Sequence, residues 1–317
     1  MKIQNKTLPE KRRPELKKLL DARGFIRVIE AHSGISALVG ENALVEDHQG
    51  KKEFDALWIS SLTDSVAKGY PDEEIVSTDS RLMTVSQISD VTSKPLLYDG
   101  DTGGFPEQLN YLIKQLEKHG VSAVVIEDKK YPKSNSLLKD AHHNMEDQAV
   151  FAQKIQYARD SQRTGELMVI ARIESFIVGE TLHEALSRAQ TYLAAGADGI
   201  MIHSKEQSPE QVLNFAQKYN QLSFPDGRKP LMCVPTTYNT VTEETLISAG
   251  FNIVLYANQL LRASYAAMQG VCQAILKGGK AEMAEPLCSS IKEILAPVGS
   301  MRSYTAEYQN KKNKLLT

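Results

Sequence analysis

The segment 127–136, with the sequence EDKKYPKSNS, has the residue types to do chemistry. Its first residue, Glu127, follows the apolar run 121–126, whose β-branched residues are typical of a buried parallel strand. The lysines, serines and asparagine that come next are too polar to be buried. A cationic loop beside a carboxylate at the end of a strand suits a metal ion with an anionic substrate over it. The alternative is a solvated surface loop.

A second acidic group follows another short apolar run. Asp99 and Asp101 are two residues apart, which in extended chain places both side chains on one side. With Glu127 from the next strand, three carboxylates would crowd together, and their repulsion would raise pKa values. Oxygen ligands of this kind favour a hard divalent cation, Mg²⁺ or Mn²⁺. The alternative is that the aspartates cap the next helix or shape the turn at Gly103 and Gly104.

Two basic side chains follow later apolar runs. The Arg172 guanidinium offers a rigid fork of donors to a phosphate or a carboxylate, and His203 could donate to the same oxyanion. Alternatively, Arg172 pairs with Glu174 and His203 is a satisfied histidine at the rim. Opposite a cluster of carboxylates, we expect the pair to bind an anion.

These residues must be positioned by alternating strands and helices. The apolar runs that we predict as strands are 25–29, 54–58, 95–98, 121–126, 168–171, 199–202, 230–234 and 252–256. The predicted helices are 9–22, one from about residue 35, 106–119, 147–161, 181–195, 209–219, 242–249 and 264–276, while the polar segment 41–53 contains a predicted loop at 47–52. Eight such units predict a single α/β domain over residues 1–317, a (β/α)8 TIM-type barrel with an N-terminal helix and a C-terminal helical tail. An open doubly wound sheet is the alternative.

In a barrel, the residues at the ends of the strands converge on one face, where the active site lies. The polar residues at those ends are Glu30, His32, Ser60, Ser61, Asp99, Asp101, Glu127, Arg172, Glu174, His203, Thr236 and Asn258. Solvation alone does not explain polar residues after nearly every strand.

Composition limits the classes of function. The formal net charge of −2 gives no indication of nucleic acid or an anionic membrane surface as a partner. Three separated cysteines fit a reducing cytoplasm better than a disulfide framework. No apolar run is long enough for a transmembrane helix, and the N-terminus lacks the apolar region of a signal peptide.

Several segments together resemble the phosphoenolpyruvate mutase family of the isocitrate lyase superfamily. They lie in the family's order across roughly residues 10–300. The most specific is 127–136, because Glu-Asp-Lys-x5-Asn-Ser marks the mutases. The others include Glu30-Ala-His32, Trp58-Ile-Ser60-Ser61-Leu62, Asp99-Gly-Asp101-Thr-Gly, Ala171-Arg-Ile-Glu174, Met201-Ile-His-Ser-Lys205, Val234-Pro-Thr236 and Tyr256-Ala-Asn258.

The resemblance implies a role for each site residue. Mg²⁺ would be held by Asp99, with Asp101 and Glu127 acting largely through water. The pyruvyl carboxylate and enolate would be bound by Trp58, Ser60, Ser61 and Leu62. The phosphoryl group would be surrounded by Asn135, Arg172 and His203. Lys133 and Asn135 would lie on a gating loop, and Asp72 would be the catalytic aspartate.

The resemblance also implies the reaction and the assembly. Phosphoenolpyruvate and 3-phosphonopyruvate would interconvert, and another enzyme that consumes phosphonopyruvate would drive the reaction. The eighth helix would be exchanged between subunits of a homodimer or homotetramer. Independently of the resemblance, the polar sequence of the tail 302–317 predicts that it frays or packs on a neighbouring subunit. The chain departs from the family in an insertion at about 41–53, in Ile59 and Ser61 in place of glycines, and in Gly104-Phe-Pro.

Three alternative functions stay open. Phosphonopyruvate hydrolase shares the expected site but has threonine where this chain has Asn135. A carbon–carbon lyase of the isocitrate or 2-methylisocitrate type needs a loop cysteine, whereas the cysteines here are Cys233, Cys272 and Cys288. A catalytically silent barrel that acts as a binding protein is the third.

Overall fold

A computed structural model describes residues 7–48, 50–136, 143–223, 225 and 227–299. The chain forms two compact units, one from Thr7 to Arg262 and one from Ala263 onward. The first unit contains every predicted site residue.

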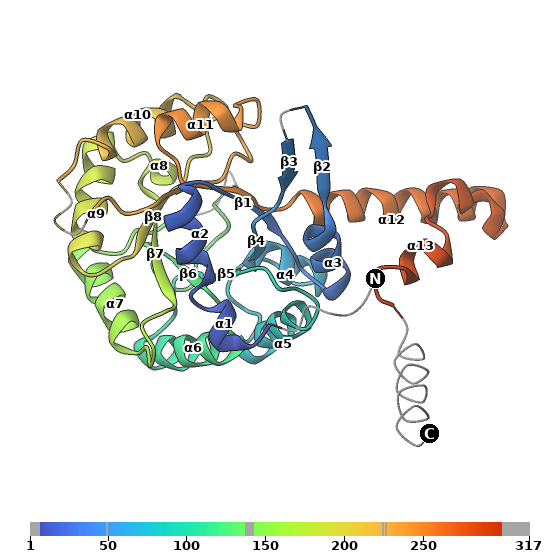
Figure 1. The fold of residues 1–317 in the computed structure, drawn as a ribbon, viewed down its shortest axis with the longest axis horizontal. Helices are drawn as coiled ribbons and strands as arrows, with labels where there is room; N and C mark the ends of the chain where they lie inside the picture. Colours follow the sequence, from blue (N-terminus) through green and yellow to red (C-terminus); the bar gives the residue numbers. More distant parts are fainter. Residues whose placement is uncertain (1–6, 49, 137–142, 224, 226, 300–317) are drawn as a thin grey trace, which may run out of the picture. The chain divides into compact units, whose positions relative to one another are not determined.

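The first unit is a closed barrel of eight parallel strands, with helices around it (Figure 1). Its strand order is β1-β10-β9-β8-β7-β6-β5-β4. Each barrel strand pairs with the next barrel strand along the chain, and the last strand, β10, pairs with β1 to close the barrel. The (β/α)8 prediction is therefore confirmed, and the open sheet is wrong. The strands are β1 (Ile26–Glu30), β4 (Ala56–Ile59), β5 (Leu96–Asp99), β6 (Ala123–Glu127), β7 (Met168–Ile173), β8 (Gly199–Ile202), β9 (Leu231–Cys233) and β10 (Ile253–Tyr256).

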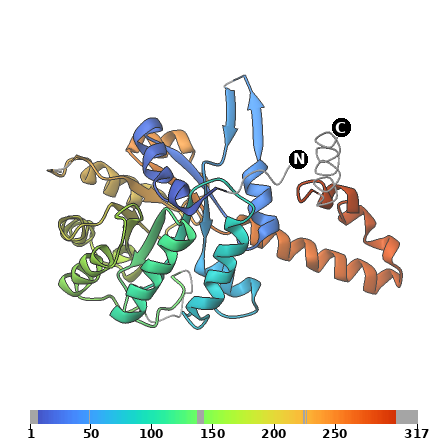
Figure 2. The same ribbon diagram turned by 60° about the horizontal axis from the view of Figure 1, so that its bottom comes forward.

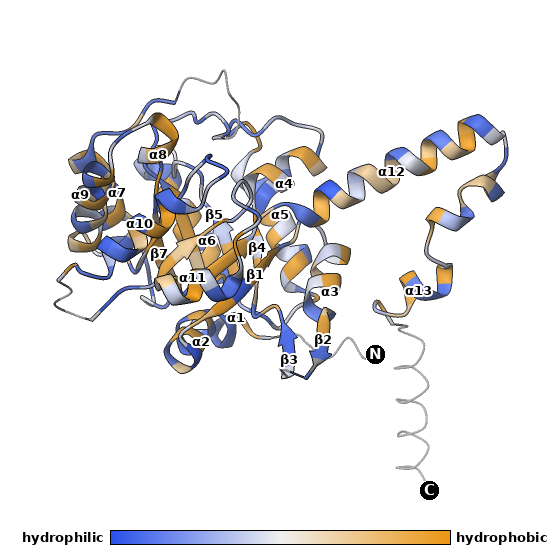
Figure 3. Cartoon of the chain, turned by 90° about the horizontal axis from the view of Figure 1, so that it is seen from above, coloured by the Kyte–Doolittle hydropathy of each residue, from blue (hydrophilic) through white to orange (hydrophobic). Residues whose placement is uncertain are grey.

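Helices cover the outside of the barrel, and their apolar sides face the strands (Figure 3). Because both faces of each strand are buried, the strands are almost continuously apolar. The helices of this unit are α1 (Pro9–Arg12), α2 (Glu15–Arg23), α3 (Gly34–Asn42), α4 (Ser61–Ala67), α5 (Thr78–Ser89), α6 (Pro106–His119), α7 (Gln148–Asp160), α8 (Ser175–Val178), α9 (Leu182–Ala194), α10 (Glu210–Tyr219) and α11 (Glu243–Ala249).

Proline, glycine and capping residues define several helix ends at the positions predicted from the sequence. Helix α6 begins at Pro106 and ends before Gly120, whose φ of 73° suits a residue without a Cβ. The side chain of Asp147 caps α7 by accepting hydrogen bonds from the amides of Ala149 and Val150.

Two local predictions are wrong. The predicted loop at 47–52 falls within the antiparallel hairpin β2 (Leu44–Asp47) and β3 (Gly50–Glu53), so residues 50–52 are strand; the hairpin extends away from the barrel strands (Figure 2). The sequence of this hairpin lacks the apolar alternation typical of a strand, because the hairpin is exposed to solvent and many of its residues are polar. The predicted helix 9–22 is two helices, since Pro14 lacks the amide that a continuous helix requires.

The second unit contains most of α12 (Gln259–Gly278), two 3₁₀ turns, η1 (Ala281–Met283) and η2 (Glu285–Leu287), and α13 (Ile291–Leu295). Helix α12 is longer than predicted, and none of its residues is buried. Among the helices of the described ranges, none has the length and apolarity to cross a membrane. The predicted tail 302–317 lies outside the described residues. The single domain and the helix exchange stay predictions.

Candidate active site

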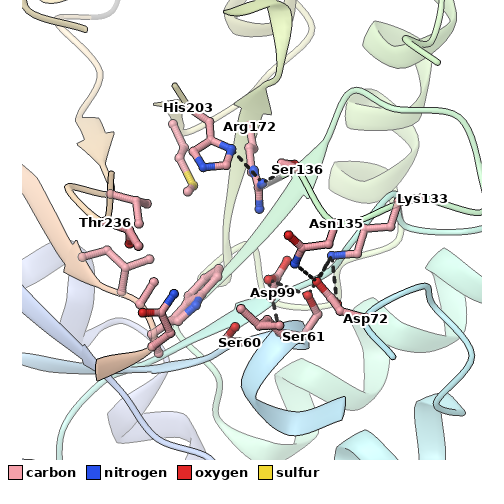
Figure 4. A pocket seen from close by; sticks show the side chains of 17 residues that line it. Ser60, Ser61, Asp72, Asp99, Lys133, Asn135, Ser136, Arg172, His203 and Thr236 are labelled. Atoms are coloured by element: carbon pink, nitrogen blue, oxygen red, sulfur yellow. Dashed lines mark hydrogen bonds and ion pairs between the residues drawn. The ribbon is translucent and has the colours of Figure 1, made fainter. Parts of the chain in front are cut away.

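A cavity at the carboxyl ends of the barrel strands contains most of the predicted site residues. Its volume is about 60 Å³. Polar side chains face one another across it from several strands and from the 128–136 loop (Figure 4). The predicted residues that line it are Trp58, Ser60, Ser61, Leu62, Asp72, Asp99, Lys133, Asn135, Arg172 and His203. Asp101 and Glu127 lie next to this lining, in ion pairs with Lys133 and Arg172 respectively.

Asp99 is held by the first turn of α4. It is the last residue of β5, and its Oδ2 accepts hydrogen bonds from the amide and the hydroxyl of Ser61, at 3.2 and 3.0 Å. Burial opposes its ionisation, but the charges of Lys133, Arg172 and Arg81 outweigh burial and hold the pKa of Asp99 below its usual value. The carboxylate is therefore ionised and oriented. Ser61 therefore orients Asp99 through both its amide and its hydroxyl, and it also lines the cavity.

Asp101 lies between two basic side chains. Its Oδ2 accepts a hydrogen bond from Arg81 Nη1 at 2.6 Å, and its Oδ1 lies 2.7 Å from Lys133 Nζ. Arg81 also donates to the carbonyl of Asp99 at 2.7 Å and covers the ring of Tyr98. Arg81 and Lys133 thus neutralise the charge of Asp101, a role that we expected from the sequence for a metal ion.

The 128–136 loop contributes Lys133, Asn135 and Ser136 to the cavity lining, and two of these side chains contact Asp72. Asn135 Nδ2 donates to Asp72 Oδ2 at 2.7 Å, and Lys133 Nζ lies 3.2 Å from Asp72 Oδ1 (Figure 4). Lys133 Nζ also donates to Ser61 Oγ at 2.8 Å. Burial opposes the charge of Lys133, but Asp101, Glu127 and Asp72 raise its pKa well above the usual value. A protonated ammonium therefore lies among these carboxylates.

Arg172 and His203 form a buried group on the opposite side. Both contact Glu174: the Arg172 guanidinium pairs with Oε1 of Glu174, and His203 Nδ1 lies 2.8 Å from the same oxygen. Arg172 Nη2 also donates to Ser136 Oγ at 3.1 Å. The sequence alternative, an Arg172–Glu174 pair, is therefore present, and it still leaves both residues lining the cavity. Burial lowers the pKa of His203 despite the opposing charge of Glu174.

The carboxylate of Glu127 is the best candidate for a further metal contact. Both of its oxygens are buried and accept no hydrogen bond, although Arg172 Nη2 lies 3.3 Å and Lys129 Nζ 3.7 Å away. Burial outweighs these cations and raises its pKa to about 7. In the described part of the chain, no three acidic, histidine or cysteine side chains converge on one point where they could hold an ion. The oxygen donors suit a hard cation reached partly through water.

Sequence reasoning missed several residues of the site. Arg81, Glu74 and Lys129 were not selected, although each contacts a predicted site residue or the loop that carries one. Arg81 lies inside α5 and Glu74 in the connection before it, far from any strand end. No local signal marks these two residues, because their partners are reached only through the path of the chain between α4 and α5. Lys129, in contrast, belongs to the Glu-Asp-Lys motif directly after β6 and could have been selected from the sequence.

Comparisons with known proteins agree with this geometry. The family model described as phosphoenolpyruvate phosphomutase matches residues 16–276. The phosphoenolpyruvate phosphomutase of Tetrahymena pyriformis is 36% identical over 281 residues, 88% of this chain and 89% of that protein. A crystal structure of the phosphomutase from Streptomyces platensis subsp. rosaceus has a TM-score of 0.82 at 33% identity and covers 96% of this chain and 99% of its own.

A phosphonopyruvate hydrolase is also similar. Its structure in complex with oxalate and Mg²⁺ has a TM-score of 0.81 at 30% identity, and the match covers 95% of this chain and 99% of that chain.

Proposed function

The chain belongs to the phosphoenolpyruvate phosphomutase family, and from that premise we propose that it interconverts phosphoenolpyruvate and 3-phosphonopyruvate by intramolecular phosphoryl transfer. The observation that carries the proposal is the hydrogen bond from Asn135 to Asp72, 2.7 Å long, between two residues that line the cavity. Asn135 occupies the position at which the mutase pattern of the sequence differs from the hydrolase pattern.

The small cavity supports a mechanism in which the loop opens and closes. Ligand sites are typically about 300–1,000 Å³, whereas this cavity has about 60 Å³ with Lys133 extended into it. Substrate therefore enters only when the 128–136 loop moves. Closure then excludes water, which would otherwise attack the phosphoryl group in transit.

Different residues of this chain would hold the two ends of the substrate. Arg172, His203 and Asn135 would hold the phosphoryl group, while Ser60 and Leu62 would hold the pyruvyl end. Phosphoryl transfer passes through a loose, metaphosphate-like transition state, so positioning and charge stabilisation supply most of the catalysis. The bond from phosphorus to C3 breaks as the bond to the enol oxygen forms, and no water is consumed. Asp72 would guide the migrating group with the help of Lys133.

We further propose that Asp99 holds Mg²⁺, with Asp101 and Glu127 acting through water. When bound, the ion would supply positive charge that stabilises the pyruvate enolate. The two Glu127 oxygens without hydrogen bonds support this proposal, because buried carboxylates otherwise find donors. Mn²⁺ would suit the same oxygen donors.

The decisive test is phosphorus NMR of the purified protein with phosphonopyruvate and Mg²⁺. We expect a phosphoenolpyruvate signal that disappears when EDTA removes the metal. Inorganic phosphate with an equal amount of pyruvate would instead identify a hydrolase, the second candidate given the similar hydrolase structure. An unchanged spectrum would reject both and direct attention to lyase substrates, although 127–146 contains no cysteine to serve as the lyase acid.

We also propose that the protein acts as a homodimer or homotetramer with exchanged eighth helices. The apolar residues of α12 support this, because an apolar helix without buried residues is unstable unless another surface covers it. An enzyme that consumes phosphonopyruvate would be its functional partner, since the equilibrium in this family favours phosphoenolpyruvate.

A further inference from the structure

Glu74 joins two loops that border the active site. Its Oε1 accepts hydrogen bonds from the amide and the hydroxyl of Thr102, at 3.0 and 2.8 Å. Its Oε2 accepts one from the amide of Lys133, at 2.8 Å. Thr102 directly follows Asp101 after β5, and Lys133 lies in the 128–136 loop. One carboxylate therefore connects the loop of the proposed metal ligands to the loop that brings Lys133 and Asn135 to the cavity.

The backbone of Glu74 supports a specific role for this residue. Its φ is 56°, in the left-handed region that residues with a Cβ rarely adopt. Within the described ranges, Asp101 is the other non-glycine residue with positive φ. Such conformations persist where the surrounding contacts hold them, and they concentrate at functional sites. The contacts that hold Glu74 are those to Thr102 and Lys133.

A second contact joins the same two loops. The rings of Phe105 and Tyr131 pack with centroids 5.2 Å apart and their planes at 57°. Both rings are more than one-third exposed, so burial in the core does not explain why they pair. Gly104-Phe105-Pro106, which departs from the family pattern, supplies one ring. Like the hydrogen bonds of Glu74, this aromatic pair holds the two loops together.

We propose that Glu74 is a positioning residue that fastens the 128–136 loop in its closed position and so holds Lys133 and Asn135 at Asp72. The inference deepens the proposed function and rests on it for the catalytic consequence. A loop fastened less tightly would open more often during phosphoryl transfer. Water would then compete with C3 and the enol oxygen for the phosphoryl group, and inorganic phosphate and pyruvate would form.

The test compares Glu74→Gln with Glu73→Gln, the same change at the neighbouring exposed residue. Glutamine can still accept from Thr102, but its NH₂ group cannot accept from the amide of Lys133. Trypsin cleavage after Lys130 and Lys133, followed by mass spectrometry, reports loop opening without any turnover. We expect cleavage at least about tenfold faster in E74Q, the usual factor for losing a hydrogen bond to a charged group. We also expect a larger share of inorganic phosphate among the products.

The outcomes separate this inference from the proposed function. If wild-type protein converts no phosphonopyruvate, the proposed function fails, while the trypsin comparison still tests Glu74. Equal cleavage rates in E74Q and E73Q would overturn the inference. Cleavage spread over the whole chain with a lowered melting temperature would also overturn it, because the role would then be general stability. If E74Q does not fold, Glu74→Asp, one methylene too short to reach both loops, replaces it under the same criteria.

Discussion

At the scale of single residues, Lys133 is the basic group on which the acidic side chains converge. Its ammonium lies within 3.2 Å of Ser61, Asp72 and Asp101. A buried charge is tolerated only when paired, so these partners and the lysine depend on one another. The loop cannot open without separating Lys133 from its carboxylates.

Asn135→Thr should shift the reaction from transfer toward hydrolysis. The hydroxyl of threonine is shorter than the amide that bridges to Asp72, so the closed loop would be held less firmly. We expect the ratio of pyruvate to phosphoenolpyruvate to rise, measured by phosphorus NMR together with a lactate dehydrogenase assay. Ser134→Thr, which adds a methyl group to the same loop, is the control. A product ratio that is identical in N135T and wild type would contradict the role of Asn135.

Asp72→Asn should lower kcat by about 10²–10³-fold, the range found when one preorganised charge-stabilising contact is removed. The change keeps the shape of the side chain but removes the charge that faces Lys133 and one of the two acceptor oxygens that Lys133 and Asn135 share. Steady-state kinetics with phosphonopyruvate measures it, and E73Q is the control of equal charge change. A kcat within about threefold of wild type would show that Asp72 is not catalytic.

Asp99→Asn should weaken metal binding at least about tenfold, because even loss of an outer-sphere partner costs 10–100-fold. Titration with Mn²⁺ followed by EPR measures the affinity directly and needs no turnover. Asp79→Asn, at an exposed residue of α5, controls for the lost charge. If D99N bound Mn²⁺ as tightly as wild type, Asp99 could not be the metal ligand.

At the scale of elements, helix α6 shows how a buried carboxylate fixes a connection. Glu117 accepts hydrogen bonds from the amides of Arg163 and Thr164, at 2.8 and 3.0 Å, and from the hydroxyl of Thr164. This carboxylate fixes the connection between α7 and β7, the strand that carries Arg172 to the cavity. Although burial opposes its charge, these hydrogen bonds lower the pKa of Glu117.

Glu117→Gln should lower the free energy of unfolding at pH 7 by about 1–3 kcal/mol, because two amides lose their carboxylate acceptor. The folded pKa lies below the unfolded value, so the stabilisation is present above about pH 4.5. It is lost as the pH falls through the folded pKa. Urea unfolding at pH 7 and near pH 3.5 should therefore show a difference that shrinks in acid. Asp160→Asn, at an exposed residue of α7, is the control, and a difference that grows in acid would contradict the assignment.

At the scale of the whole molecule, the barrel and the unit from Ala263 differ in how they are stabilised. The barrel buries its apolar residues in two clusters. One cluster lies between the strands and the surrounding helices, and the other lies mainly within the ring of strands. In the second unit, large apolar side chains of α12 and α13 are exposed, among them Tyr265, Met268, Ile275, Leu276 and Ile291. An exposed apolar surface of this kind is typical of a protein–protein contact.

The double substitution Met268→Glu and Ile275→Glu should lower the oligomeric state, because both residues lie on the exposed apolar side of α12. Size-exclusion chromatography with light scattering should give a dimer or tetramer for wild type and a smaller species for the variant. Gln273→Glu, on the same helix, should leave the mass unchanged. A monomeric wild-type protein would reject the predicted assembly.

The sequence determined the class of fold and the types of residue at the strand ends. Strand and helix periods are local properties, and the eight alternating units were enough to predict a closed barrel. Since parallel strands all end on one face, Asp99, Glu127, Arg172 and His203 could be brought together from their positions in the chain alone. The exposed hairpin at 44–53 escaped prediction because polar outer strands lack the apolar alternation on which such reasoning depends.

Only the tertiary structure decided which charges neutralise one another. Arg81 meets Asp101 across 20 residues, and Glu74 meets Lys133 across 59. These contacts depend on the paths of loops whose conformation is set by packing and by residues with positive φ. No local period encodes such a path. For this reason residues that line the cavity could be predicted from the sequence, whereas the contacts of Glu74 with Thr102 and Lys133 could not.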